Sequence, residues 1–462
     1  MVSPRIGFTY RLPDEGVVVR GGMGIFAGRL PLVWPGGIYN NNGVSLGGIT
    51  VNNPAITFNP DPRTQPTAQS QSLLNAKGQI DLVAKDFRLP SVFRTSLAVE
   101  KRLGDGWTLT TEGIFTKNIW EIEYLNVNLL PPVGKSLGVG SRNVYNPNGS
   151  GPTKIPLRSS GANPYPGNVY LLQNNQGRRG YSYSLTLSID KAFRNGFALN
   201  ANYTYGNSIS LNEGTSSQNN SQWRYMESVN GRNFLDLSTS DFDIAHRINA
   251  FISKQFDYSR KNISTIVSLV YIGQSGNPYS YVYRNSPVND QSSSESNDLI
   301  YVPTTAELGS MTFVPNTVNG VIYTPQQQKD LLEAFIQGDK YLSKNRGKFS
   351  ERNGARLPFT HIIDLKIEQK FNVKFNGKKY SFALSYDIFN FTNMLNKDWG
   401  RTYFLANDNF PLITFNNYTS TGNLTPTYKY TPFSGKPYGV NTSLNPGYTA
   451  RWISQLGLRF SF

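Results

Sequence analysis

The chain has 462 residues and a formal net charge of +15, with 27 tyrosines, 27 phenylalanines and an aromatic fraction of 13%. It has no cysteine and only two histidines, His246 and His361, which excludes disulfide, iron–sulfur and thiol chemistry and any histidine-rich metal or haem site within the chain. The basic residues are scattered without a compact basic motif, so the charge favours contact with anionic lipopolysaccharide, or an anion-tolerant lumen, over nucleic-acid binding.

Eleven segments alternate apolar and polar residues with a period of two, which places successive side chains on opposite faces of a strand. In 181–193, for example, Tyr183, Leu185 and Leu187 alternate with serine and threonine. The predicted strands cover, in chain order, residues 3–12, 17–27, 91–103, 107–118, 181–193, 197–207, 246–256, 263–273, 361–371, 379–391 and 451–462. A soluble sandwich would alternate as well. Aromatic residues near the ends of the apolar faces, and single charges within the polar faces, favour a membrane barrel with a hydrated lumen.

The connections between these strands are alternately short and long. Short turns rich in Gly, Asn and Asp are predicted at 13–16, 104–106, 194–196, 257–262 and 372–378. Long polar segments fill 28–90, 119–180, 208–245, 274–360 and 392–450, with a short helix predicted at 324–338. Loops of this length are unusual in a compact soluble domain, whereas outer-membrane barrels have short periplasmic turns and long extracellular loops. The sequence therefore predicts an all-β fold, a transmembrane antiparallel β-barrel in the outer membrane.

The number of predicted strands is odd, so the first and the last strand run in the same direction. Bacterial single-chain barrels have even strand numbers, and an open sheet edge in lipid leaves backbone groups unpaired at a cost of several kcal/mol each. Residues 1–30 also contain no export signal. We therefore expect residues 1–462 to be the C-terminal half of a 22-stranded barrel, with the remaining strands supplied by upstream sequence or by another chain.

Three stretches resemble TonB-dependent outer-membrane transporters. The hairpin formed by Ser3–Tyr10 and Val19–Phe26 resembles the mid-barrel hairpin of the Oar-like subgroup, Phe382–Asn393 resembles its penultimate strand, and Arg451–Phe462, ending on phenylalanine, resembles its closing strand. The resemblance implies a barrel wall with extracellular loops that bind a large substrate for energised transport. It also implies an N-terminal plug that contacts TonB, and that plug is not visible in this sequence.

The partners expected from these observations are outer-membrane lipid and lipopolysaccharide, TonB through the missing plug region, and surface lipoproteins or another chain that completes the barrel. The alternative function is a non-transporting structural or adhesive barrel that binds a surface partner through its loops. Nucleic acid is not among the expected partners.

We expect no enzymatic activity, no cofactor and no metal site. Asp243 could orient His246 as a catalytic base, but the favoured interpretation is a strand entry in which Arg247 pairs with Asp243. The glycines at 21, 22 and 24 precede no helix and so do not predict a phosphate loop. The clusters Asn297-Asp298 and Asn407-Asp408-Asn409 match no calcium-loop spacing, so loop solvation is favoured over Ca²⁺ binding.

Aromatic residues in the predicted loops are the remaining candidates for ligand contact. Tyrosine and tryptophan offer a large contact area with a polar group, although many such side chains pack loops against one another. The candidates are Trp34, Tyr39, Trp120, Tyr145, Tyr165, Trp223, Tyr225, Tyr301, Trp399 and Tyr403.

Overall fold

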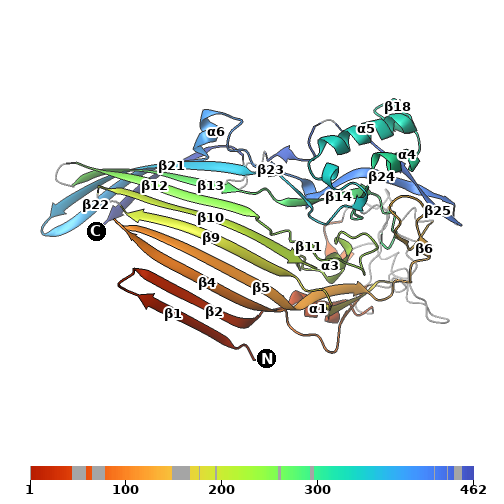
Figure 1. The fold of residues 1–462 in the computed structure, drawn as a ribbon, viewed down its shortest axis with the longest axis horizontal. Coiled ribbons are helices and arrows are strands. Elements are labelled where there is room, and N and C mark those ends of the chain that lie inside the picture. Colours follow the sequence, from red (N-terminus) through yellow and green to blue (C-terminus); the bar gives the residue numbers. More distant parts are fainter. Residues whose placement is uncertain are drawn as a thin grey trace.

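A computed structural model describes residues 2–43, 59–64, 79–147, 167–175, 177–192, 195–258, 262–291, 296–420, 422–433, 435–441 and 450–462. Its main feature is a sheet of eleven long antiparallel strands in chain order (Figure 1). These strands are β1 (Arg5–Leu12), β2 (Val17–Ala27), β4 (Ser91–Gly104), β5 (Trp107–Asn126), β9 (Tyr181–Ala192), β10 (Phe197–Ser210), β12 (His246–Tyr258), β13 (Ile263–Gln274), β21 (Thr360–Phe375), β22 (Lys378–Phe389) and β27 (Ile453–Ser461). All eleven predicted strands are confirmed.

The short turns that join these strands follow from local sequence. Asn376 and Gly377 both have positive φ angles, 49° and 78°, and they connect Phe375 to Lys378 in a two-residue hairpin. Asn-Gly is the preferred sequence for such a turn because both central residues must adopt positive φ. The predicted turn at 372–378 was too long, since β21 and β22 continue to the hairpin itself.

The apolar face of the sheet is its exposed face. On β9, Tyr183, Leu185 and Leu187 are 37%, 53% and 48% exposed, and the serines and threonines between them lie on the other face. The same holds across β21, β22 and β27, where Ile367, Tyr386 and Leu456 lie side by side in register and are all exposed. In a soluble sandwich these side chains would form the core. Exposed rows of this kind are what a lipid-facing wall requires.

The opposite face carries a hydrogen-bonded and charged network. The Lys366 ammonium lies 3.2 Å from the carboxylate of Asp387, and Lys370 lies 3.0 Å from Glu368. Neighbouring strands add side-chain hydrogen bonds, such as that between the Thr186 and Thr204 hydroxyls at 2.9 Å. A polar inner face matches the hydrated lumen that the sequence predicts.

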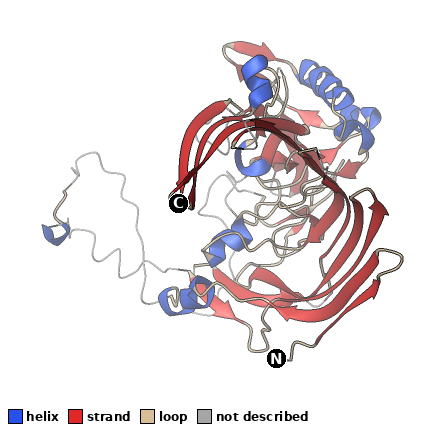
Figure 2. Cartoon of the chain, turned by 90° about the vertical axis from the view of Figure 1, so that its left-hand side faces the viewer, coloured by secondary structure: helices blue, strands red, loops and turns tan. Residues whose placement is uncertain are grey.

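The two edges of the sheet do not pair with each other. β1 pairs with β2 and β27 pairs with β22, and viewed end-on the sheet forms an open arc with the N- and C-termini at its two borders (Figure 2). The eleven strands are therefore not closed into a barrel by a β1–β27 ladder. Among the described residues, no helix combines the length and apolarity needed to cross a membrane.

The long connections are more ordered than the sequence indicated. The predicted helix is confirmed as α5 (Pro325–Gly338), which begins with a capping box between Thr324 and Gln327. The other helices are α1 (Val33–Asn40), α3 (Asn219–Arg224), α4 (Thr305–Ser310) and α6 (Phe391–Leu395), with 3-10 turns η1 (Pro62–Thr64), η4 (Leu342–Lys344) and η5 (Ala406–Asp408).

Further strands, most of them short, complete these connections. They are β3 (Ile80–Val83), β6 (Gly134–Lys135), β7 (Asn143–Val144), β8 (Val169–Asn175), β11 (Ser238–Thr239), β14 (Pro278–Arg284), β15 (Tyr301–Val302), β16 (Thr312–Phe313), β17 (Asn316–Val318), β18 (Val321–Tyr323), β19 (Lys348–Phe349), β20 (Ala355–Arg356), β23 (Tyr403–Phe404), β24 (Asn409–Ser420), β25 (Asn423–Lys429) and β26 (Gly439–Val440).

A second sheet, in the order β16-β25-β24-β14-β20, packs with α4 and α5 at the loop end of the molecule (Figure 1). We call this assembly the outer cap. Its core is a cluster of buried aliphatic and aromatic side chains, with Ile300, Leu332, Ile336 and Ile413 fully buried. The sequence predicted only long polar segments and one short helix here, so it missed the strands of this region. Segments of the chain more than a hundred residues apart pair there, such as β14 with β24, and no local pattern encodes that pairing.

Candidate functional site

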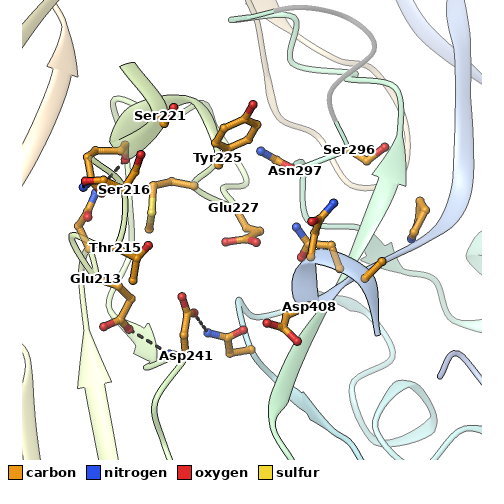
Figure 3. A pocket seen from close by; sticks show the side chains of 18 residues that line it. Glu213, Thr215, Ser216, Ser221, Tyr225, Glu227, Asp241, Ser296, Asn297 and Asp408 are labelled. Atoms are coloured by element: carbon orange, nitrogen blue, oxygen red, sulfur yellow. Dashed lines mark hydrogen bonds between the residues drawn. The ribbon is translucent and has the colours of Figure 1, made fainter. Parts of the chain in front are cut away.

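A large pocket lies between the end of the long sheet and the outer cap. It encloses about 680 Å³, within the range of sites that hold small ligands. One side is formed by the segment that follows β10 and contains α3, and the other by η5 and the start of β24. We call this cavity the acidic pocket, because Glu213, Glu227, Asp241 and Asp408 line it (Figure 3). Neither lysine nor arginine lines it among the described residues.

Hydrogen bonds fix the floor of the acidic pocket. The Asp241 carboxylate accepts a hydrogen bond from the Asn353 side-chain amide at 2.6 Å, and the Asp241 backbone amide donates to the Glu213 carboxylate at 3.0 Å (Figure 3). Asn353 also donates to the backbone carbonyl of Thr239 at 2.9 Å. Arg352, which is buried beside the pocket, donates to the carbonyl of Leu211 at 2.7 Å. The pocket is thus built from segments that lie far apart in the chain and are joined by hydrogen bonds.

Two of the carboxyl groups have raised pKa values. Burial raises the pKa of Glu227, although the nearby Arg352 guanidinium and a hydrogen bond from Asn409 oppose the shift. Burial also raises the pKa of Asp408, and the negative charge of Asp241 adds to the effect. A ligand that brings positive charge or hydrogen-bond donors would stabilise the ionised form of these carboxyl groups, whereas an anion would destabilise it.

Six of the ten candidate aromatic residues fall into three groups. Trp34, Tyr145 and Trp223 are buried together in a cluster that packs the loops, with the indole N–H of Trp223 donating to Asn233 Oδ1 at 2.7 Å. Tyr225 is 53% exposed and lines the acidic pocket. Trp399 and Tyr403 line a separate groove on the other side of the sheet.

The remaining candidates lie apart from the acidic pocket. Tyr39 is exposed, Trp120 is half-buried on β5, and the Tyr301 hydroxyl donates to Glu307 at 2.9 Å within the outer cap. Tyr165 lies outside the described residues. Ligand contact stays a prediction for the exposed members of the set.

The histidines and their neighbours also have definite positions. His246 shares a 2.7 Å hydrogen bond with the Tyr203 hydroxyl, and His361 lies at the start of β21, as expected. Asp243 pairs with Arg356 and also accepts a hydrogen bond from the Ser208 amide, so the pairing with Arg247 was wrong. Arg356 reaches Asp243 from β20, which the local sequence could not indicate. No group of three or more histidine or acidic side chains suited to a metal ion occurs in the described ranges.

The sequence drew attention to some residues of the acidic pocket but did not indicate that they lie together. The Asn407-Asp408-Asn409 run and Asn297 line the pocket, while Asp298 is buried away from it beside Arg232 and Asp290. Glu213 and Glu227 gave no signal, because each is a single acidic residue in a polar segment. Only the fold brings them together.

An outward apolar belt, a polar inner face and long loops that build a pocket define an outer-membrane β-barrel. A family model described as an outer membrane beta barrel domain matches residues 1–429, and the chain belongs to that family. The protein is therefore located in the outer membrane. No curated protein matches the sequence.

Solved structures with similar folds include the outer membrane transporter YddB from Escherichia coli, at 10% identity and a TM-score of 0.38. That match covers 97% of this chain and 39% of the transporter. The ferric enterobactin receptor PfeA from Pseudomonas aeruginosa matches at 11% identity and a TM-score of 0.37, covering 84% of this chain and 34% of the receptor. The chain thus spans well under half the length of these proteins.

Proposed function

We propose that the chain is the C-terminal part of the barrel of a TonB-dependent transporter or receptor of the Oar-like subgroup. It supplies wall and extracellular loops for the energised transport of a large substrate. The observation that carries this proposal is the open eleven-stranded sheet, whose two edge strands each have a single paired neighbour. In lipid, further strands must satisfy those edges, because each unpaired backbone group costs several kcal/mol. Eleven more strands would give an even barrel of 22.

The acidic pocket is the proposed outer contact for the substrate. It lies in the loops at the end of the sheet opposite the short turns, between the sheet and the outer cap, on the side from which a ligand would arrive from outside the cell. Its carboxylates and side-chain amides favour a ligand rich in hydrogen-bond donors. Tyr225 adds an exposed ring at the wall of the pocket. The proposal includes no catalytic step, and TonB acts through a plug that belongs to the rest of the protein.

The edge strands can be tested directly, because the chain has no native cysteine. A cysteine at Thr9, on β1, should cross-link in the outer membrane to a strand that does not belong to residues 1–462. Cross-linking of Thr9→Cys to Gly457→Cys on β27 would show a closed eleven-stranded barrel and overturn the half-barrel proposal.

The transport role needs a separate experiment. A nutrient whose use requires this protein is first identified by growth on limiting media, with and without its gene. Growth on that nutrient should then be lost when TonB is deleted, and reduced by Asp408→Lys, which reverses a charge in the acidic pocket. Glu351→Lys, an exposed charge reversal that is not among the pocket-lining residues, is the matched control. Partner binding without any TonB-dependent growth would instead support the adhesive alternative.

A further inference from the structure

A second groove lies on the outward face of the sheet, away from the acidic pocket. Phe359, His361 and Ile363 form one wall, and Trp399, Arg401 and Tyr403 form the other. The groove holds about 310 Å³. The second wall belongs to the segment 390–404, which contains α6 and stands off the outer end of β21 (Figure 1). We call this cavity the rim groove.

The strand register places the rim groove on the lipid side. Ile363 pairs with Tyr271 on β13, two positions before Leu365, which pairs with Leu269 and Ile388. Residues directly opposite each other share a face, and so do residues two apart on one strand. Ile363 therefore belongs to the same apolar rows as the exposed Ile367, and the rim groove continues the lipid-facing belt.

Aromatic and polar groups mark the outer boundary of that belt. The His361 ring stacks on Tyr271 with 6.1 Å between ring centroids, and Nδ1 of His361 lies 2.8 Å from the Tyr271 hydroxyl. The ring of Phe359 lies 4.8 Å from that of His361. β21 begins here, at the end opposite its Asn-Gly hairpin, so this is the extracellular end of the strand. Rings with one apolar and one polar side are typical of the membrane–water interface.

The segment with α6 presents large apolar side chains on a rigid frame. Leu395 and Trp399 are 59% and 54% exposed. The frame is set by Asn390, whose backbone amide donates to Asp364 at 2.7 Å and whose side chain donates to the Gly400 carbonyl at 2.8 Å. Asn393 adds a hydrogen bond to the Trp399 carbonyl at 2.8 Å. Exposed apolar groups held in place by such hydrogen bonds indicate that something outside the chain covers them.

Positive charge surrounds the same groups. Lys397 and Arg451 are exposed beside α6 and β27, and Arg401 lines the rim groove. Asp398, which pairs with Arg401, is the one acidic side chain among the described residues of 391–404 and 450–453. Interfacial aromatics beside basic residues are the combination that holds phosphorylated lipid headgroups.

We propose that the rim groove binds an anionic lipid of the outer leaflet. The acyl chains lie along Ile363 and Trp399, and the headgroup phosphate lies at Arg401 and Lys397. Membrane lipid covers the adjoining apolar rows of the sheet, so lipid can also enter the groove. This inference does not depend on the transport function, since any barrel in this membrane would meet the same lipid.

The lipid preference can be measured on the whole protein by native mass spectrometry in detergent. The titrated probes are diphosphoryl lipid A and, as the neutral lipid, phosphatidylcholine. Wild type should prefer lipid A, and the double substitution Lys397→Gln with Arg401→Gln should lower that preference on the order of tenfold. The matched control is Lys340→Gln, an exposed lysine of the outer cap. Equal affinity for both lipids, or a preference that survives the double substitution, would overturn the proposal.

A second measurement does not require the binding preference to be large. A nitroxide attached at Leu395→Cys should be relaxed by oxygen, which concentrates in the bilayer, more than by an aqueous nickel chelate. The reference position is Ile322→Cys on β18, in the loop that leads into α5, where the side chain is 66% exposed and the aqueous reagent should dominate. If Leu395 responds as Ile322 does, α6 stands in water and the rim groove holds no membrane lipid.

Discussion

The substitution Leu187→Arg tests the membrane face of the sheet most directly. Leu187 lies on β9, which has 12 residues, and it is 48% exposed on the apolar side. It is six residues from Tyr181 and five from Ala192, which is about 20 Å and about 17 Å along the strand at ~3.3 Å per residue. With a strand tilt of about 40°, these lengths span about 15 Å and about 13 Å along the membrane normal. Leu187 is therefore close to the midplane of the apolar band.

An arginine at this depth is expected to destabilise the fold by about 2–4 kcal/mol, because its charge must leave water or drag water into the lipid. Ser188→Arg, one residue further on, points to the polar inner face, where Ser188 pairs in register with Thr110 and Asn202. It should cost far less. Leu365→Arg on β21 repeats the test at a second site.

The assay is the free energy of unfolding of the whole protein in lipid vesicles, measured by denaturant titration. Wild type, Leu187→Arg and Ser188→Arg are compared in vesicles of the same composition. Equal losses for the two arginine variants would refute a lipid-facing wall and favour a soluble sandwich with a core on both faces. A greater loss for Ser188→Arg would reverse the assignment of the two faces.

Three further results are expected. A cysteine at Ile322 should be labelled by a membrane-impermeant reagent on intact cells and one at Asn376 should not, and the opposite pattern would invert the topology. Burial raises the pKa of Glu227, so its protonated form stabilises the loops. This contribution should be fully present below the ordinary pKa of a glutamate, 4.5, and be lost as pH rises through the raised value. Proteolysis of the loops should show the loss in wild type and less of it in Glu227→Gln. Arg232→Ala should destabilise the loops by about 3–5 kcal/mol, because Asp290 is fully buried and would lose its cationic partner; a loss under about 1 kcal/mol by denaturant titration would contradict this.

The wall of the barrel could be predicted from the sequence because its code is local. Alternation depends on residues two apart, so the sequence alone predicts that Leu185 and Leu187 share a face, without any knowledge of the neighbouring strands. The helix α5 could be predicted as well, since Thr324 and Gln327 form a capping box and Pro325 occupies its first turn.

The outer cap and the acidic pocket could not be predicted, because their contacts join distant parts of the chain. Arg352 reaches the carbonyl of Leu211 across 141 residues, and the Tyr418 hydroxyl reaches the Pro287 carbonyl across 131. Two asparagines in the predicted loops show the same limit. In the sequence, Asn219 and Asn289 look like exposed loop residues, yet they are 4% and 3% exposed.

The apolar side chains of the wall face lipid, whereas those of the outer cap pack inside the protein. This difference explains where a binding pocket can form. Rows such as Leu185 and Leu187 need lipid outside them, whereas Leu332 and Ile336 need the protein interior. Neither kind of apolar packing can continue where the two meet, so polar side chains fill the boundary. The acidic pocket lies at that boundary, and burial raises the pKa of Glu227 there. Because Glu213, Asp241 and Asp408 line the same cavity and no lysine or arginine does so among the described residues, we propose that a ligand with hydrogen-bond donors or positive charge balances these carboxyl groups.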